Sequence, residues 1–303
     1  MRTVPDSTLA RPRWRVWVLA ARPKTLAAAI APVLMGTAMA WADGGFHLLS
    51  ALLALVGALL IQIGTNFTND YADFVKGADT AARKGPLRVT AAGLVTPQTM
   101  RRATALTFAL AVVAGLYLIW RGGWPVLLIG LLSILFGLLY TSGRYALAYV
   151  GLGELFVLIF FGPVAVGGTY YVQTLSISKE VLVMGLAPGL IATGILLVNN
   201  VRDVEEDRKA GKRTLVVRLG RAFGVGLYAC CLFGALAVPA LWFATTWRHG
   251  GAMAVLALLP VAVRAVYTLA QHTEAAVLNA LLAGTGRLLL VYSVLFSMGW
   301  VLT

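Results

Sequence analysis

Nine apolar segments of roughly membrane-crossing length divide this chain of 303 residues. A transmembrane helix needs about 20 mainly apolar residues, and segments of this kind recur from Thr25 to Leu302. Composition agrees with this pattern, because 59% of the residues are hydrophobic and only 12% are charged, against about 25% charged in a soluble domain. So few charges cannot cover a surface that faces water. We therefore expect an all-α integral membrane protein with about nine transmembrane helices.

The expected spans form one membrane domain, residues 22–303, behind a basic cytoplasmic tail at residues 1–21. Polar loops are expected near residues 68–102 and 199–222. Between the last two spans, Ala275–Ala283 is a short apolar stretch with polar flanks, which predicts an interfacial or re-entrant piece. The nine predicted spans are Thr25–Trp41, Leu48–Phe67, Ala103–Trp120, Trp124–Tyr140, Leu147–Val172, Val181–Val198, Phe223–Trp242, Ala252–Leu269 and Leu288–Leu302.

The basic residues predict how the chain is oriented. If the N-terminus lies inside the cell, 22 of the 25 basic residues fall on the cytoplasmic side, and only Arg121, Lys179 and Arg248 fall outside. An excess of Lys and Arg in cytoplasmic loops is the usual orientation signal. We expect a multi-pass protein of the cytoplasmic membrane, in contact with membrane lipid, whose N-terminus and long polar loops are cytoplasmic. The net charge of +13 does not indicate nucleic-acid binding, because the basic residues are spread over loops without a recognition fold.

The two long loops begin with related acidic sequences. Span two runs into a stretch that contains Asn66, Asn69, Asp70 and Asp73, and span six runs into one that contains Asn199, Asp203 and Asp207. Residues at i and i+4 lie on one face of a helix, so each set forms a polar stripe. Both spans run from outside to inside, which brings the two stripes to the same membrane surface.

Carboxylates gathered at a membrane boundary repel one another unless a cation lies between them. Mg²⁺ prefers oxygen ligands and is often held by one or two carboxylates together with substrate phosphates, whereas zinc or copper would require His or Cys, which are absent from these stretches. Two facing stripes predict two Mg²⁺ ions that a diphosphate could bridge. The candidate metal ligands are Asn69, Asp70, Asp73, Asp79, Asn199, Asp203 and Asp207.

Basic residues follow each acidic stripe and precede span one on the same side of the membrane. Metal-bound diphosphate keeps negative charge, which Arg and Lys side chains would stabilise as the diphosphate leaves. The recurrence of an acidic stripe and then a basic loop indicates an internal repeat of about 130 residues. The candidate diphosphate-binding residues are Arg22, Lys24, Arg83, Arg88 and Lys212.

The motifs resemble those of UbiA-type membrane prenyltransferases. In that family the first motif is Asn-Asp-x-x-Asp-x-x-x-Asp, matched here by Asn69, Asp70 and Asp73, and the second is Asp-x-x-x-Asp, matched by Asp203 and Asp207. The third acid of the first motif is replaced by Gly77, with Asp79 two residues later. This shift, and the sequences Gly85-Pro86-Leu87-Arg88 and Ala21-Arg22-Pro23-Lys24-Thr25-Leu26, are similar to the 1,4-dihydroxy-2-naphthoate branch of the family.

The resemblance implies nine helices around a central cavity and two Mg²⁺ ions that act with the catalytic residues Asp73, Asp203 and Asp207. It implies transfer of a polyprenyl group from polyprenyl diphosphate, through an allylic carbocation, to 1,4-dihydroxy-2-naphthoate. Loss of the carboxyl group would give demethylmenaquinone, an intermediate of menaquinone biosynthesis. Our candidates for binding the aromatic acceptor are Arg144, Tyr149 and Glu154, at the inner end of span five.

Two other interpretations remain open at this point. The same fold could transfer the prenyl group to 4-hydroxybenzoate, homogentisate, haem or a phosphoribose. A transporter with an intracellular ion site is less favoured, because the repeat is parallel and the acids lie at one surface instead of the midplane. The motifs set neither the length of the prenyl chain nor the oligomeric state.

Overall fold

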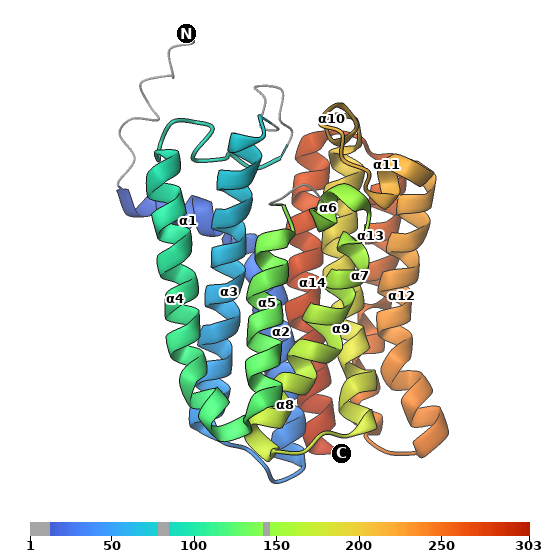
Figure 1. Cartoon of the computed structure of the whole chain (residues 1–303). Helices are drawn as coiled ribbons and strands as arrows, with labels where there is room; N and C mark the ends of the chain where they lie inside the picture. Colours follow the sequence, from blue (N-terminus) through green and yellow to red (C-terminus); the bar gives the residue numbers. More distant parts are fainter. Residues whose placement is uncertain (1–12, 78–84, 142–145) are drawn as a thin grey trace.

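The computed structural model describes residues 13–77, 85–141 and 146–303, and these residues form a bundle of helices that run between two ends (Figure 1). In chain order the elements are α1 (Arg13–Ala21), α2 (Pro23–Ala42), α3 (Leu48–Val75), α4 (Pro97–Gly122), α5 (Trp124–Leu139), α6 (Leu147–Val150), α7 (Gly153–Ile159), the π-helical turn η2 (Phe160–Val164), α8 (Ala165–Thr174), α9 (Lys179–Arg202), α10 (Val204–Lys209), α11 (Leu215–Leu219), α12 (Arg221–Thr246), the 3₁₀ helix η3 (Gly250–Leu258), α13 (Leu259–Gln271) and α14 (Ala275–Leu302).

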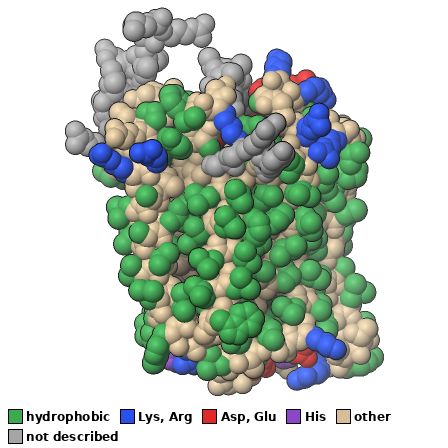
Figure 2. All heavy atoms as spheres, in the orientation of Figure 1, with side chains coloured by type: hydrophobic (Ala, Val, Ile, Leu, Met, Phe, Trp, Pro, Cys, Tyr) green, Lys and Arg blue, Asp and Glu red, His purple; other side chains and the backbone are tan. Residues whose placement is uncertain are grey.

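The described helices have the lengths and the surface of an integral membrane protein. Among the described residues, eight helical segments are long and apolar enough to cross a membrane, and α5 is a shorter apolar helix beside them. Hydrophobic side chains cover the sides of the bundle, while Lys and Arg gather toward its ends (Figure 2). Large apolar side chains such as those of Leu106, Val113 and Leu131 are exposed, as lipid-facing positions require. The expected all-α membrane fold is confirmed.

Helices α3 and α9 continue beyond their apolar parts into the two polar stripes. The N-cap of α3 is His47, and that of α9 is Ser178, whose hydroxyl accepts a hydrogen bond from the N–H of Val181. Helix α3 ends at Val75, just before Gly77, whose φ of +66° suits glycine. The first stripe is therefore helical throughout, and its side chains point from a rigid element.

The fifth predicted span is a broken helix. Gly151 has a φ of +79° and separates α6 from α7, and a Cβ at this position would lie 2.7 Å from the carbonyl oxygen of Arg213. Farther along, Pro163 lies within η2 and removes a backbone N–H from the helical hydrogen-bond pattern. The break places α6 at the end of the bundle, against the loop that follows α9.

Helix α14 corrects one expectation from the sequence. Residues Ala275–Ala283 are the beginning of a helix that runs unbroken to Leu302, so they form no separate interfacial piece. Arg287 interrupts the apolar run but not the helix, since the backbone hydrogen bonds of a helix do not require an apolar side chain at each position. Gly286 lets α14 approach the start of α2, since a Cβ there would lie 3.0 Å from the carbonyl oxygen of Lys24. A helical glycine costs only about 1 kcal/mol, which these contacts offset.

Helix α9 lies at the centre of the bundle, and most of its residues are buried. Small residues let it approach the broken fifth span closely. A Cβ on Gly189 would lie 2.4 Å from the carbonyl oxygen of Leu158, and one on Gly185 would lie 2.8 Å from the Cα of Pro163. Close backbone approach through small residues is a common way to pack membrane helices. These contacts fix the position of α9, which carries the second stripe.

The close contact at Gly189 makes a prediction about stability. Gly189→Ala forces the added methyl group against backbone, so we expect it to destabilise the protein by about 1–3 kcal/mol. Gly226→Ala on α12 is the matched control, because a Cβ at Gly226 meets nothing within 4 Å. Thermal unfolding in detergent should show a lower midpoint for the first variant and an equal or higher one for the control. Equal midpoints for the two variants would contradict this packing.

Candidate active site

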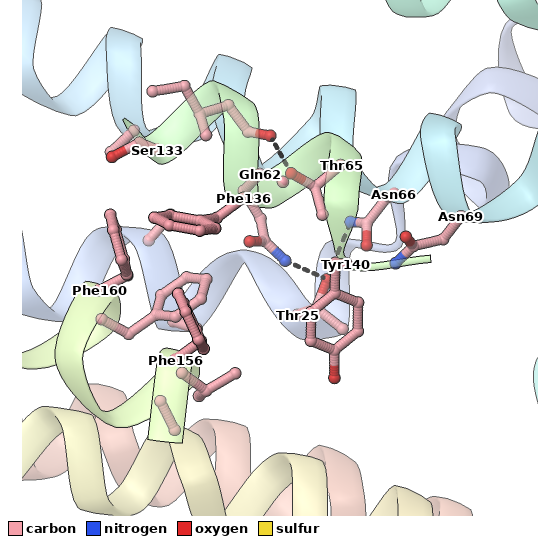
Figure 3. Close-up of a pocket in the computed structure, with 18 of the residues that line it drawn as sticks. Thr25, Gln62, Thr65, Asn66, Asn69, Ser133, Phe136, Tyr140, Phe156 and Phe160 are labelled. Atoms are coloured by element: carbon pink, nitrogen blue, oxygen red, sulfur yellow. Dashed lines mark hydrogen bonds between the residues drawn. The ribbon is translucent and has the colours of Figure 1, made fainter. Parts of the chain in front are cut away.

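A cavity of about 910 Å³ lies inside the bundle, between α2, α3, α4, α5, α7, α8, α9 and α14. Both polar stripes line one end of it. Along α5 its wall extends from Tyr140 to Val126, which is about 21 Å at 1.5 Å per residue. Below the stripes most of the wall is apolar, with aromatic rings and a few hydroxyl and amide groups (Figure 3). The cavity therefore has a charged end and an apolar length.

The first stripe presents Asn69 and Asp73 to the cavity. Arg88, from the segment before α4, donates from Nη2 to Oδ2 of Asp73 at 2.5 Å, and the Asp73 side chain is almost wholly buried. Oδ1 of Asp73 is also buried and accepts no hydrogen bond from a described residue. The amide oxygen of Asn69 accepts from the hydroxyl of Thr141 at 2.7 Å. The pair of Asp73 and Arg88 thus brings both a negative and a positive group to the cavity wall.

Asp70 has a different environment from Asp73. Its two carboxylate oxygens accept hydrogen bonds from the backbone N–H groups of Val89 and Thr90, at 3.1 and 3.0 Å. Asp70 is 1% exposed and does not line the cavity. A carboxylate that accepts two backbone hydrogen bonds holds the bonded segment in place. Asp70 therefore fixes the segment that carries Arg88.

Arg202 organises the second stripe. Its guanidinium donates to both carboxylate oxygens of Asp203, at 2.7 and 2.6 Å, to Oδ1 of Asn199 at 2.7 Å and to Oδ1 of Asn279 at 2.6 Å. Arg202 is 2% exposed, so these bonds form away from bulk water, where they are strong. One guanidinium thus fixes the oxygens of two stripe residues and joins α9 to α14.

Asp207 of α10 and Lys212 of the segment that follows it form an ion pair, with 3.2 Å between Nζ of Lys212 and Oδ1 of Asp207. Burial raises the pKa of the Asp207 carboxyl; Lys212 opposes this rise, and Asp203 and Asp73 add to it. Burial alone would lower the pKa of Lys212, but the carboxylates of Asp207 and Asp73 outweigh it and the pKa is raised. Lys212 therefore stays charged under the influence of acids from both stripes.

Two lysines from different loops stack on the ring of Tyr149. Nζ of Lys76 lies 4.2 Å from the ring centroid and Nζ of Lys212 lies 5.4 Å from it. Lys76 also donates to the carbonyl oxygen of Thr141 at 2.6 Å. Burial lowers the pKa of Lys76, an effect that Asp73 opposes and Lys212 adds to. Both ammonium groups make cation–π contacts with the Tyr149 ring, which links the segments that follow the two stripes.

Glu154 lies behind the second stripe. Its Oε1 accepts a hydrogen bond from Nδ2 of Asn200 at 2.9 Å, and the residue is 5% exposed. Asn200 lines the cavity, whereas Glu154 and Tyr149 do not. A buried carboxylate needs a hydrogen-bond partner, and here that partner is Asn200, which follows Asn199 in the chain. The structure thus places Glu154 where it can orient Asn200.

The structure brings most of the predicted site residues to one cavity. The exceptions are Asp70, Tyr149 and Glu154, which lie outside its wall for the reasons given above, and Asp79, Arg83 and Arg144, which lie outside the described residues. The predicted residues that share the wall are Asn69, Asp73, Asn199, Asp203 and Asp207 from the metal set, and Arg22, Lys24, Arg88 and Lys212 from the diphosphate set.

Sequence reasoning gave no role to three polar residues of the site. Arg202 was counted only among the orientation-setting basic residues, although it holds the second stripe. Asn279 and Gln62 also reach the cavity wall. Asn279 and Gln62 are each the single amide in an apolar stretch of helix. Burying an amide in a membrane is costly, and this cost is the signal that could have identified both residues.

The donor set fits Mg²⁺ held jointly with a substrate. In the parts of the chain that the structure describes, no three His, Cys, Asp or Glu side chains are grouped so as to hold a metal by themselves. Mg²⁺ does not require such a cage, because it usually takes one or two carboxylates and completes its coordination with phosphate oxygens and water. Each stripe offers amide and carboxylate oxygens, and the buried, unpaired Oδ1 of Asp73 is one of them.

Fold and site together define a class: a multi-pass helical membrane protein whose internal cavity suits an amphiphile with a polyanionic head. The model of the UbiA prenyltransferase family matches residues 29–283. This chain belongs to the UbiA prenyltransferase family.

Relatives and solved structures agree with this assignment. The chain is 37% identical over 293 residues to the 1,4-dihydroxy-2-naphthoate octaprenyltransferase of Escherichia coli, covering 95% of each chain. It is 39% identical over 283 residues to the protein of the same name from Mycobacterium tuberculosis, covering 91% of this chain and 94% of that one. The structure of a UbiA homolog from Archaeoglobus fulgidus bound to DMAPP and Mg²⁺ matches 91% of this chain and 99% of its own, with a TM-score of 0.60 and 14% identity.

The role of Arg202 predicts a contrast between two arginines of the same region. Arg202→Met should destabilise the protein by about 3–5 kcal/mol, because it leaves the buried Asp203 without its partner. Arg208→Met is the control, since Arg208 pairs with Glu205 at 2.9 Å on the surface and such pairs contribute about 0–1 kcal/mol. Thermal unfolding in detergent measures both variants. Equal losses of stability would show that Arg202 does not organise the stripe.

Proposed function

We propose that this protein transfers a polyprenyl group from polyprenyl diphosphate to 1,4-dihydroxy-2-naphthoate, with loss of the carboxyl group, to give demethylmenaquinone for menaquinone biosynthesis. The observation that carries this proposal is the cavity, which has two oxygen-rich stripes and four basic residues at one end and an apolar length below them. Similarity to 1,4-dihydroxy-2-naphthoate octaprenyltransferases over almost the whole chain supports this choice of acceptor.

The head of the donor would bind between the stripes. We assign Asn69 and Asp73 on one side, and Asn199, Asp203 and Asp207 on the other, as the residues that hold two Mg²⁺ ions, with Asp79 beyond the described residues as a further ligand. Bound Mg²⁺ would neutralise the diphosphate and make it a better leaving group. The UbiA homolog bound to DMAPP and Mg²⁺ supports this pairing of metal and diphosphate. Asp70 supports the site through the segment that holds Arg88.

Basic side chains would stabilise the diphosphate as it leaves. Arg22, Lys24, Arg88 and Lys212 come from three different parts of the chain and line the same end of the cavity. Lys212 stays charged because acids of both stripes raise its pKa. Fixed cations near the departing oxygens stabilise charge that develops in the transition state. Arg83, which lies outside the described residues, remains a candidate for the same role.

The reaction balances as an electrophilic substitution. The bond between C1 of the prenyl group and the diphosphate oxygen breaks, and its electron pair leaves with the diphosphate. The electron-rich ring carbon that carries the carboxyl group then bonds to C1. Carbon dioxide departs from that carbon, and the released electron pair restores the aromatic ring. The apolar cavity contributes by keeping water from the allylic cation, which would otherwise be hydrolysed.

The charged end of the cavity is proposed to face the cytoplasm. The proposed orientation follows from the 22 basic residues on that side and places the protein in the cytoplasmic membrane. The donor's tail would then extend into the bilayer while its head stays near water-soluble Mg²⁺ and the acceptor.

The stripes give the first test of this function. Asp73→Asn and Asp203→Asn should each lower the rate of prenyl transfer at least 1,000-fold, and excess EDTA should have the same effect on the wild type. The protein should still fold in the membrane, because the amide oxygen of Asn can accept the hydrogen bond of Arg88 or Arg202. Glu205→Ala is the matched control, because Glu205 lies on α10 beside the second stripe but is exposed, and within the described residues its ion pair is with Arg208. Full activity of either Asp variant, or activity in EDTA, would refute the assignment.

The acceptor is tested by analysis of the product. Purified protein is offered 1,4-dihydroxy-2-naphthoate, 4-hydroxybenzoate and homogentisate, each with the same polyprenyl diphosphate, and the products are identified by mass spectrometry. We expect turnover of the naphthoate with a mass that shows loss of carbon dioxide. If the protein prenylates another acceptor but not the naphthoate, the assignment as a prenyltransferase stands and the proposed acceptor is refuted.

A further inference from the structure

The polar face of α3 extends deeper into the cavity than the part of the first stripe that would face the diphosphate, Asn69 and Asp73. Gln62, Asn66, Asn69 and Asp73 are spaced i, i+4, i+7 and i+11, so they lie along one face of the helix, and all four line the cavity. Gln62 lies seven residues before Asn69, which is about 10 Å along the helix axis. Two amides therefore stand below the charged end, where the wall is otherwise mainly apolar.

The hydroxyl of Thr25 holds both amides. Oγ1 of Thr25 donates to the carbonyl oxygen of Arg22 at 3.0 Å and accepts from Nδ2 of Asn66 at 3.1 Å and from Nε2 of Gln62 at 3.4 Å. One donated and two accepted hydrogen bonds use the whole capacity of a hydroxyl group. Thr25 thus fixes which end of each amide faces α2 and which end is left for the cavity.

The amide oxygens of Asn66 and Gln62 are the atoms available to a ligand in the cavity. Nδ2 of Asn66 donates to the carbonyl oxygen of Ala21 at 2.9 Å as well as to Thr25, so both of its hydrogens are used. Neither Oδ1 of Asn66 nor Oε1 of Gln62 accepts a hydrogen bond from a described residue. Asn66 is 3% exposed and lines the cavity, as Gln62 does, so the space open to their oxygens is the cavity itself. A ligand in the cavity that donates a hydrogen bond would satisfy these acceptors.

Aromatic rings stand beside these amides. Phe136, Phe156 and Phe160 line the same cavity, with ring centroids 4.5 Å apart for the first two and 5.2 Å apart for Phe136 and Phe160. In Figure 3 the three rings gather on one side of Gln62, with Thr25 and Asn66 on the other. A flat apolar ligand would find aromatic partners on this wall. Two hydrogen-bond acceptors next to an aromatic wall suit an aromatic ring that carries hydroxyl groups.

We propose that Gln62 and Asn66, oriented by Thr25, bind the phenolic hydroxyl groups of the aromatic acceptor. The inference rests on the proposed function and adds the position of the acceptor, below the diphosphate and beside the phenylalanine rings. Two neutral acceptor oxygens match the two hydroxyl groups of a 1,4-diol. A phenol that donates its hydrogen bond to a carbonyl oxygen gains electron density on its own oxygen and ring, which favours attack on the prenyl carbon.

The test replaces the amide without changing its size. Gln62→Met should raise the KM for 1,4-dihydroxy-2-naphthoate at least tenfold and leave the KM for polyprenyl diphosphate within twofold. Two analogues that each lack one hydroxyl, 1-hydroxy-2-naphthoate and 4-hydroxy-2-naphthoate, are then used as competitive inhibitors. One analogue lacks the hydroxyl group that Gln62 binds, so its inhibition constant should change less than twofold in Gln62→Met. The other analogue keeps that hydroxyl group, so its inhibition constant should rise as much as the KM for the naphthoate.

Thr25→Val is the second variant, and it should raise the same KM by releasing both amides. Thr65→Val is the matched control, since Thr65 also lines the cavity but donates its hydroxyl hydrogen to its own helix, at Ile61, at 2.9 Å. An unchanged KM for the naphthoate in both test variants, equal rises in the two KM values, or equal rises in both inhibition constants would overturn the inference. Failure of the wild type to prenylate the naphthoate would instead overturn the proposed function.

Discussion

The structure depends on neutralising the carboxylates that are buried where helices α3 and α9 end. An isolated ionised carboxylate is costly to bury near hydrocarbon, so each acid of the stripes has a fixed partner. Arg88 pairs with Asp73, Arg202 with Asp203, and Lys212 with Asp207. These partners let acidic residues remain inside the bundle and bring positive charge to the same wall. Such a wall offers carboxylates to bound cations and basic side chains to phosphate oxygens, so it suits a ligand that carries both.

Close packing makes this charged end rigid. The glycines of α9 bring its backbone against the broken fifth span, and Arg202 joins the end of α9 to α14. On the other side, Asp70 fixes the segment that carries Arg88. Below these groups the cavity continues along α5 between apolar side chains. Under the proposed function, a diphosphate head and an isoprenoid tail would find opposite environments within one cavity, and this difference would orient the substrate.

The sequence was most informative where a physical cost left a pattern. Apolar runs predicted the spans, and acids near hydrocarbon indicated the two stripes. It could not separate Asp70 from Asp73, because both lie on nearly the same face of α3 and only the backbone of Val89 and Thr90 decides which one leaves the cavity. Likewise, the position of Glu154 behind Asn200 depends on how α7 packs on α9. The sequence predicted Ala275–Ala283 and Leu288–Leu302 as separate pieces, because Arg287 and its polar neighbours interrupt the apolar pattern, but they do not interrupt the backbone of α14.

The central claim is that both stripes bind one diphosphate, and a double-mutant cycle tests it most directly. Binding of a non-hydrolysable geranyl thiodiphosphate is measured in Mg²⁺ for the wild type, Asn69→Ala, Asn199→Ala and the double variant. If one ligand requires both stripes, each single variant should lose most of the affinity and the double variant should lose little more, so that the two effects are strongly coupled. Losses that simply multiply in the double variant would mean that the stripes act independently, which would contradict this account.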